Sequence, residues 1–164
     1  MAGITTPVAG THKYLSFTLG GESYGIDILR VQEIIGMMTV TRVPRTPSFV
    51  RGVINLRGRV IPVVDLRTKF ELADATDTDR TCIVVVQLSG DGSAVMGAVV
   101  DEVSEVLDIA LDQIEDTPEF GGGINAEFVL GMGKVHDRVV MLLDIERVLT
   151  GTELETVSAL AAEA

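Results

Sequence analysis

The residues Gly21-Glu22-Ser23-Tyr24-Gly25 match the Gly-x-Ser-x-Gly nucleophile elbow of serine hydrolases letter for letter. That elbow holds its serine on a sharp turn between a strand and a helix, with a histidine acting on it as a base. Here Ser23 opens the second strand of a predicted hairpin, and neither of the two histidines, His12 and His136, is well placed to serve it. The motif therefore does not predict a hydrolase.

The histidines and the cysteine do not predict a metal site either. His12 and His136 lie 124 residues apart and Cys82 is the one cysteine, so no close histidine pair and no Cys-x-x-Cys unit exists. Zinc sites are built from such clusters, and we expect no metal and no other cofactor. The glycine-rich run Gly131–Lys134 lacks the serine or threonine that a phosphate loop needs where Val135 stands. The sequence predicts a protein that is not an enzyme.

A basic turn between two apolar arms is a better candidate for binding. The arms, 52–56 and 60–66, are rich in β-branched residues, and Arg57-Gly58-Arg59 joins them. A glycine in this place can take the positive φ of a tight hairpin. The sequence thus predicts two antiparallel strands with arginines at their tip, and arginine on a rigid scaffold suits an acidic partner.

A second candidate surface lies earlier in the chain, where Val31 and Ile34 flank the charge of Glu33. An apolar pair beside a charge is a plausible docking strip. The alternative is that Val31 and Ile34 belong to the core. The local pattern of 27–35 leaves open whether this segment is a helical turn or a continuing strand.

The distribution of charge favours protein partners. The net charge is −11, but residues 1–80 carry ten lysines and arginines against eight acidic residues, while residues 81–164 carry three against sixteen. A nucleic-acid-binding protein would present a broad basic face. Such polarity suits protein partners met by opposite faces; an acidic surface that serves solubility alone is the alternative.

The compartment is predicted from what the sequence lacks. No apolar run approaches the ~20 residues that span a bilayer, and the N-terminal residues do not form a signal peptide. The single cysteine, Cys82, cannot form an internal disulfide. We therefore expect a cytoplasmic protein without direct membrane insertion.

The two halves of the chain repeat one pattern. Tyr24-Gly25 aligns with Met96-Gly97 at an offset of 72 residues, and Gly52 aligns with Gly131 at an offset of 79. Two copies of a unit with five short strands predict an all-β fold of two small β-barrels, because closing each sheet removes its exposed edges. We place the subdomains and flanking segments at 14–80 for the first barrel, 81–150 for the second, 1–13 for a disordered lead and 151–164 for a C-terminal helix.

The copies differ in their central hairpins. His136 stands in the second copy where the first has Arg57. Duplication explains the shared residues as structural, so Gly52 is interpreted first as a backbone requirement. Asn55 and Arg57 are private to the first copy, and function is expected there.

Two runs of the sequence resemble the CheW family of bacterial chemotaxis coupling proteins. They are INLRGRVIPVVDLR, at 54–67, and YGIDILRVQEI, at 24–34. The resemblance extends from about Tyr14 to Leu149. It implies a fold of two SH3-like five-stranded barrels with short helices. It also implies a non-enzymatic scaffold that links methyl-accepting chemoreceptors at the membrane to the chemotaxis histidine kinase CheA.

The resemblance implies a role for each candidate residue. The strip of Val31, Glu33 and Ile34 would meet the regulatory domain of the kinase, itself a double barrel. The turn residues Asn55, Arg57 and Gly58 would face the cytoplasmic tip of the receptor. Gly52 and Gly97 fall at family glycines, where larger residues would disturb packing and binding together.

Other functions remain as alternatives to this one. The same scaffold could serve a different array, controlling surface motility or a second messenger, and it could form rings with the kinase or with further copies of itself. A small enzyme with its site between the barrels lacks a catalytic constellation. A peptide-binding SH3-like module would line its groove with aromatic residues, and this chain has no Trp.

Overall fold

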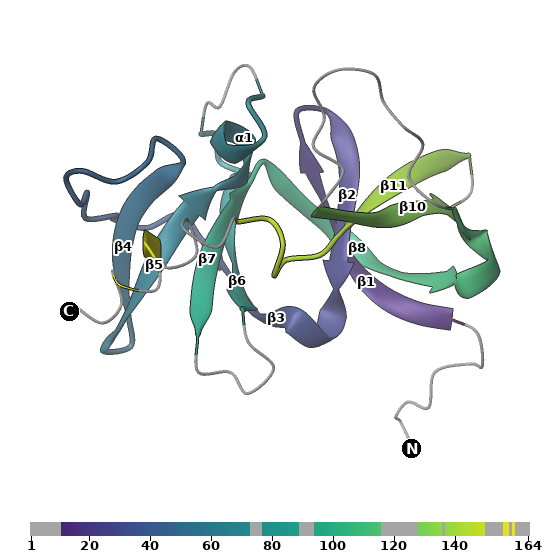
Figure 1. Ribbon diagram of the computed structural model, residues 1–164, viewed down its shortest axis with the longest axis horizontal. Coiled ribbons are helices and arrows are strands. Elements are labelled where there is room, and N and C mark those ends of the chain that lie inside the picture. Colours follow the sequence, from purple (N-terminus) through teal and green to yellow (C-terminus); the bar gives the residue numbers. More distant parts are fainter. Residues whose placement is uncertain are drawn as a thin grey trace.

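The computed structural model describes residues 11–72, 77–88, 94–115, 128–135, 137–149, 156–157 and 159. These residues are mostly β-strand and form two lobes that lie side by side (Figure 1). The elements in chain order are β1 (Thr11–Leu19), β2 (Glu22–Asp27), the 3-10 helix η1 (Ile28–Arg30), β3 (Val31–Gly36), β4 (Val50–Leu56), β5 (Arg59–Asp65), α1 (Leu66–Lys69), β6 (Cys82–Gln87), β7 (Val95–Val100), β8 (Glu102–Ala110), the 3-10 helix η2 (Leu111–Gln113), β9 (Ile114–Glu115), β10 (Val129–Val135) and β11 (Arg138–Leu143).

Each lobe is built on one sheet. The five-stranded sheet has the order β3-β6-β7-β5-β4, and the six-stranded sheet has the order β8-β1-β2-β11-β10-β9. The neighbours are antiparallel except for the pairs β5–β7 and β2–β11, which are parallel. The two orders superimpose when the offsets of the sequence repeat are applied, which confirms the all-β fold with an internal duplication.

Both sheets close on themselves through equivalent contacts. After β3 the chain reaches Thr41, which exchanges two backbone hydrogen bonds of 2.8 Å with Val53 on β4. In the other lobe β9 follows β8 through η2, and Glu115 pairs with Met132 on β10. Val53 and Met132 are repeat equivalents, so in each barrel the segment that follows the edge strand pairs with the strand at the other end of the sheet. This contact closes the barrel at that point.

The barrels exchange their first hairpins, and this corrects the predicted subdomain boundaries. The hairpin β1–β2 from the first copy belongs to the six-stranded sheet with β8, β10 and β11, while β6–β7 from the second copy belongs to the five-stranded sheet with β3, β4 and β5. The segments 14–80 and 81–150 therefore describe the two repeats, not the two barrels. The physical reason is that both copies share one pattern of apolar strands, so the pattern cannot choose between pairing within a copy and pairing across copies.

One hydrophobic core runs from lobe to lobe. Phe17 on β1 and Ile26 on β2 belong to the same cluster of buried side chains as Val84 and Met96 of the five-stranded sheet. Val157, near the C-terminus, is also fully buried in it. Burial of this apolar surface across the junction is what joins the lobes.

Several local predictions are settled or corrected. For the segment 27–35 both predicted alternatives, a helical turn and a strand, are partly correct, because a 3-10 turn is followed there by a strand. β1 begins at Thr11, so the lead is shorter than 1–13, and 1–10 lie outside the described residues. Most of the predicted C-terminal helix at 151–164 also lies outside them, although 156, 157 and 159 are helical. No helix in the described part of the chain has the length and apolar character to cross a membrane.

Candidate functional site

The tip of the β4–β5 hairpin is a two-residue turn. Leu56 pairs with Arg59, and Arg57 and Gly58 between them have φ values of 53° and 85°. Positive φ at both central residues defines the type I′ turn, whose twist matches that of the strands. Arg59 begins β5, so the turn is shorter than the predicted Arg57–Arg59.

The side chain of Asn55 fixes the shape of this tip. Its Oδ1 accepts a hydrogen bond of 2.8 Å from the backbone N–H of Gly58. A Cβ on Gly58 would meet no atom within 4 Å, so its left-handed φ rather than crowding requires a glycine. Arg57 holds a left-handed φ without being glycine, which is uncommon and marks a position to examine for function. Asn55 thus positions the arginine that the tip presents.

Arg57 forms an ion pair with Glu33 on β3. The side chain of Arg57 is 69% exposed and that of Glu33 is 24% exposed. The hydrogen bond and charge of Glu33 raise the pKa of Arg57, which keeps it a cation. The pair joins the two surfaces that the sequence predicted separately. The two residues are 24 positions apart in the sequence, so a local sequence pattern does not predict their contact.

The strip on β3 divides into a core residue and a surface residue. Val31 packs against the core cluster, which agrees with the alternative prediction that it is a core residue. The Ile34 side chain is instead 46% exposed. Within the described residues β3 pairs along one edge with β6, leaving its other edge open. Leu29, which precedes β3 in the chain, and Met38, which follows it, are also exposed, and neither was selected from the sequence. Large exposed apolar side chains beside an open edge are typical of a docking surface.

The two glycines singled out by the resemblance are sterically constrained. A Cβ on Gly52 would lie 2.0 Å from the carbonyl oxygen of Thr41, and its φ of 139° is unfavourable for other residues. A Cβ on Gly97 would lie 2.7 Å from the Cγ2 methyl of Ile83. Gly52 therefore permits closure of the barrel, and Gly97 permits the close packing of β7 on β6.

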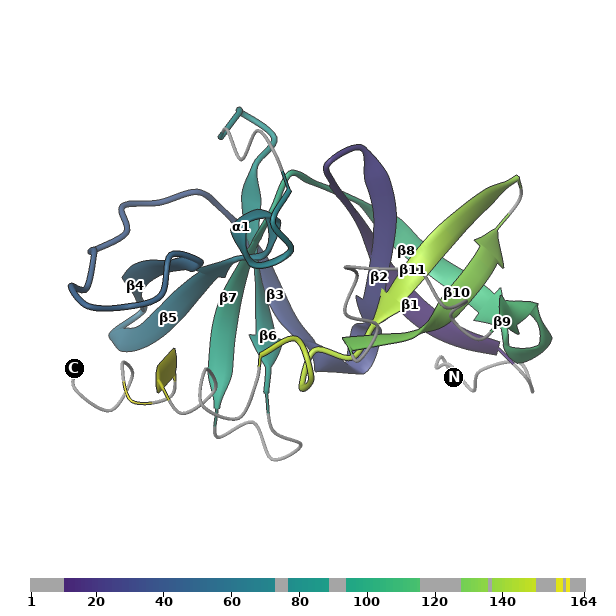
Figure 2. The same ribbon diagram turned by 45° about the horizontal axis from the view of Figure 1, so that its top comes forward.

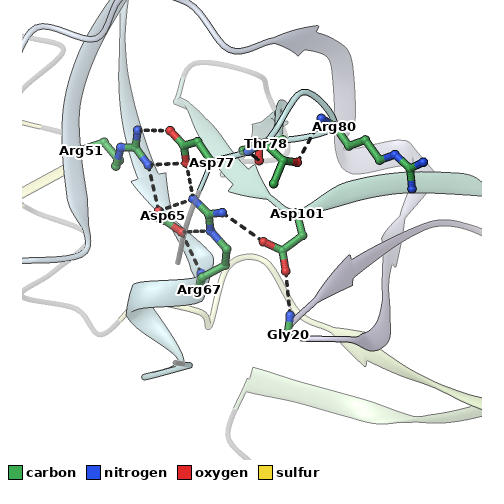
Figure 3. Close-up of polar contacts among 9 residues, drawn as sticks. Gly20, Arg51, Asp65, Arg67, Asp77, Thr78, Arg80 and Asp101 are labelled. Carbon is green, nitrogen blue, oxygen red and sulfur yellow. Dashed lines mark hydrogen bonds and ion pairs between the residues drawn. The ribbon is translucent and has the colours of Figure 1, made fainter. Parts of the chain in front are cut away.

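A buried arginine that the sequence did not reveal organises the end of β5. Arg67, in the first turn of α1, is 1% exposed, and its guanidinium donates hydrogen bonds to Asp65, Asp77 and Asp101 (Figure 3). Arg51 donates to Asp65 and Asp77 from the other side. The hydrogen bonds that Arg67 donates to Asp65 above all, with those to Asp77 and Asp101, raise the pKa of Arg67. Buried charges persist only when paired in this way.

This network predicts how stability depends on acid pH. The bidentate hydrogen bonds from Arg51, with a further one from Arg67, lower the pKa of Asp77 from 3.8 to about 2. Since the folded pKa lies below the unfolded one, the contribution of Asp77 to stability is complete above about pH 4 and is lost as the pH falls towards 2. We expect Asp77→Asn to flatten the fall in urea midpoint between pH 4 and pH 2.

The matched control for that measurement is Asp79→Asn. Asp79 is an exposed aspartate two residues away, and its replacement should leave the acid slope of the wild type unchanged. An equal slope for Asp77→Asn and the wild type would contradict the assignment.

Ser23 and Cys82, two of the candidate chemical groups, lie among the described residues. Ser23 is the second residue of β2, which continues to Asp27, so it does not lie on the strand-to-helix turn of a nucleophile elbow. Burial raises the pKa of the Cys82 thiol, which disfavours the reactive thiolate. Among the residues that the structure describes, no three His, Cys, Asp or Glu side chains are grouped to hold a metal ion. His136 lies outside the described residues.

Comparison with known proteins gives consistent matches along the chain. The family model of the CheW-like domain matches residues 13–153. Chemotaxis protein CheW of Klebsiella aerogenes is 42% identical over 98% of this chain and 98% of its own. Protein FrzA of Myxococcus xanthus is 32% identical over 84% of each chain. The crystal structure of scaffolding protein TtCheW from Thermoanaerobacter tengcongensis superimposes with a TM-score of 0.79 at 32% identity, covering 87% of this chain and 94% of that one.

Proposed function

The chain belongs to the CheW family, and on that premise we propose that it is a non-enzymatic scaffold coupling methyl-accepting chemoreceptors to the histidine kinase CheA in bacterial chemotaxis. The observation that carries the proposal is the ion pair between Arg57 and Glu33. It puts a residue of the receptor-facing tip in direct contact with a residue of the kinase-facing strand. A direct contact between two surfaces allows binding at one of them to change the surroundings of the other.

The receptor-facing surface is the tip formed by Asn55, Arg57 and Gly58. The type I′ turn and the hydrogen bond of Asn55 hold the backbone rigid, so that the exposed guanidinium is presented with little loss of conformational entropy on binding. Because Arg57 already shares its charge with Glu33, an acidic group of the receptor would compete with Glu33 for it. Receptor binding would thereby change the surroundings of β3.

The kinase-facing surface is the edge of β3 around Ile34. An open strand edge with a half-exposed isoleucine offers both main-chain hydrogen bonds and an apolar anchor to another β-domain. Glu33 stands beside this anchor and is the residue through which the tip and the strand communicate. Val31 supports the strand from the core side.

Loss of Arg57 should weaken receptor binding without damaging the hairpin. Asn-Gly is the preferred pair of a type I′ turn, so Arg57→Asn removes the guanidinium while keeping the backbone shape. We expect the dissociation constant for a receptor signalling-tip fragment to rise about tenfold or more, with an unchanged or higher melting temperature. Arg57→Glu, which also faces Glu33 with a like charge, should weaken binding further.

Arg59→Gln is the control for the receptor measurement, since it removes the neighbouring arginine of the same hairpin. Biolayer interferometry with the receptor fragment should show a change of less than about threefold for Arg59→Gln. Equal losses for the two positions would mean that the tip contributes general positive charge rather than a specific contact by Arg57.

Loss of the apolar anchor on β3 should weaken kinase binding instead. Ile34→Asp places a charge at the centre of the proposed contact, and we expect about a hundredfold loss of affinity for the regulatory domain of the kinase. Val139→Asp, a substitution at an exposed valine on β11 with similar exposure, is the control. Titration calorimetry in which both variants bind the kinase domain like the wild type would exclude β3 from the interface.

The same chain could serve an array with an output other than swimming. The similarity to Protein FrzA, at 32% identity, is the observation that keeps this second proposal open. Complementation separates the two: a strain lacking its swimming-chemotaxis scaffold should regain swarm expansion when it expresses this chain if chemotaxis is its role.

A further inference from the structure

In the described part of the chain, two crossovers lead from strands of one sheet to strands of the other, and each carries an ion pair. In the first crossover η1 leads from β2 in the six-stranded sheet to β3 in the five-stranded sheet. In the second, Asp101 lies between β7 in the five-stranded sheet and β8 in the six-stranded sheet. Because the barrels exchange hairpins, every change in the angle between them must bend these two segments.

The second crossover is tied to both lobes. Oδ1 of Asp101 accepts a hydrogen bond of 3.0 Å from the buried Arg67, which stands on α1 at the end of the five-stranded sheet. Oδ2 of Asp101 accepts one of 2.8 Å from the backbone N–H of Gly20, in the β1–β2 turn of the six-stranded sheet (Figure 3). The backbone N–H of Asp101 also donates to Thr18 on β1. One carboxylate thus bridges the two lobes.

The first crossover carries an ion pair with the charges reversed, which ties it to the six-stranded sheet. Arg30, the last residue of η1, pairs at 2.8 Å with Glu146, which follows β11 of the six-stranded sheet. Glu146 is the repeat equivalent of Arg67 at the offset of 79 residues, and Arg30 is within one residue of the equivalent of Asp101 at the offset of 72. The residue on the second crossover is the anion of its pair, Asp101, and the residue on the first crossover is the cation of its pair, Arg30.

Stacked aromatic rings also join the two lobes at the end of α1, the helix that carries Arg67. Phe70, which ends α1, stacks on Phe128 of the other lobe with ring centroids 4.6 Å apart and an interplanar angle of 6°. It also stacks on Tyr24 of β2 at 6.0 Å. α1 therefore contacts the six-stranded lobe through both its polar and its aromatic side. Figure 2 shows it on the side of its own lobe that faces the other one.

We infer that the two ion pairs, Arg67–Asp101 and Glu146–Arg30, are straps of opposite polarity that hold the barrels at one fixed angle. The four residues are proposed to act through the geometry of the two lobes. Because the two pairs have opposite polarity, neither crossover residue can pair with the partner of the other. The exchanged contacts Arg67–Arg30 and Glu146–Asp101 would bring like charges together and repel. On the proposed function, this angle sets the spacing between the surfaces on the five-stranded barrel and any contact on the other barrel.

The inference is tested by measuring the distance between the two lobes in the isolated protein, without any partner. Spin labels at Gln32→Cys on β3 and Leu130→Cys on β10, in a Cys82→Ser background, report on the two lobes by double electron–electron resonance. We expect one narrow distance for the straps as they stand. Glu146→Arg, which faces Arg30 with a like charge, should broaden the distribution, and Asp101→Ala should do the same at the other crossover.

A charge swap separates a strap from a merely structural residue. The double variant Arg30→Glu with Glu146→Arg re-forms the pair with its polarity reversed and should restore the narrow distance. Asp108→Ala, which removes the Lys13–Asp108 pair inside the six-stranded sheet, is the matched control and should change nothing. A narrow distance in Glu146→Arg, or a swap that fails to restore it, would overturn the inference.

The distance measurement and the binding measurements test the strap inference and the proposed function separately. No partner is present in the distance measurement, so failure of the adaptor role would leave its outcome unaffected. If both are correct, the strap variants should bind the receptor fragment and the kinase domain singly like the wild type. Their joint binding should also match the wild type, because both proposed surfaces lie on the five-stranded barrel, and the straps act between the barrels.

Discussion

Replacing Gly52 by alanine is expected to destabilise the protein by about 3 kcal/mol or more. The new Cβ would lie 2.0 Å from the carbonyl oxygen of Thr41 and 2.7 Å from its carbonyl carbon, both of them backbone atoms that cannot rotate away. Relief requires Thr41 to move, which breaks its two hydrogen bonds to Val53 and opens the seam of the five-stranded barrel. The φ of 139° adds strain for any residue with a side chain.

The measurement is urea unfolding followed by circular dichroism, with Gly36→Ala as the control. Gly36 ends the strand on the same barrel, and a Cβ there meets no atom within 4 Å. Gly36→Ala should therefore stay within about 0.5 kcal/mol of the wild type. Equal stability of Gly52→Ala and Gly36→Ala would show that the seam does not limit stability.

Replacing Arg67 by methionine is the second change with a large expected effect, about 3 kcal/mol of lost stability. Methionine fills part of the volume but leaves Asp65, which is 2% exposed, with Arg51 as its remaining cationic partner. Removal of one member of a buried charge network leaves the others desolvated with fewer partners, which is why the loss exceeds the net value of the pair. Arg67→Lys, which keeps the charge but not the planar set of donors, should fall in between.

Arg147→Met is the control for that experiment. Arg147 also pairs with an aspartate at the end of a strand, Asp144, but its side chain is 70% exposed. Exposed pairs contribute roughly 0–1 kcal/mol, so thermal and urea midpoints should barely change. An Arg67→Met protein as stable as the wild type would mean that the network stabilises nothing.

The sequence predicted the architecture because the repeat constrains backbone geometry. Gly52 and Gly131 are equivalent, and a Cβ on either would collide with the backbone of the segment that closes its barrel, Thr41 in one case and Glu115 in the other. Duplication preserved a glycine wherever this crossing occurs. For the same reason the offsets between the copies predicted which strands correspond.

The exchange of hairpins could not be predicted in the same way. β1–β2 and β6–β7 carry equivalent apolar patterns, so either hairpin satisfies either sheet, and the choice depends on the path of the crossovers. The burial of Arg67 was hidden as well, since arginine in a sequence usually indicates surface. Its three acceptors come from three separate segments, at Asp65, Asp77 and Asp101.

The candidate site was predicted in its residues but not in its connection. Arg57 and Glu33 were each selected, one from a basic turn and one from a charge between apolar residues. Their contact depends on the curvature of the five-stranded barrel, which local pattern does not specify. The roles of Val31 and Ile34 likewise separated when burial became known, because one packs on the core and the other faces solvent.

The most direct test of the account is whether the chain bridges two proteins that do not otherwise meet. A receptor signalling-tip fragment is immobilised, and the regulatory domain of the kinase is passed over it with and without the chain. We expect the kinase domain to be retained when the wild-type chain is present. Arg57→Asn should fail to bind the immobilised receptor fragment. Ile34→Asp should bind the receptor fragment but retain no kinase domain. Equal retention of the kinase domain without the chain, or a wild-type chain that binds neither protein, would contradict the adaptor role.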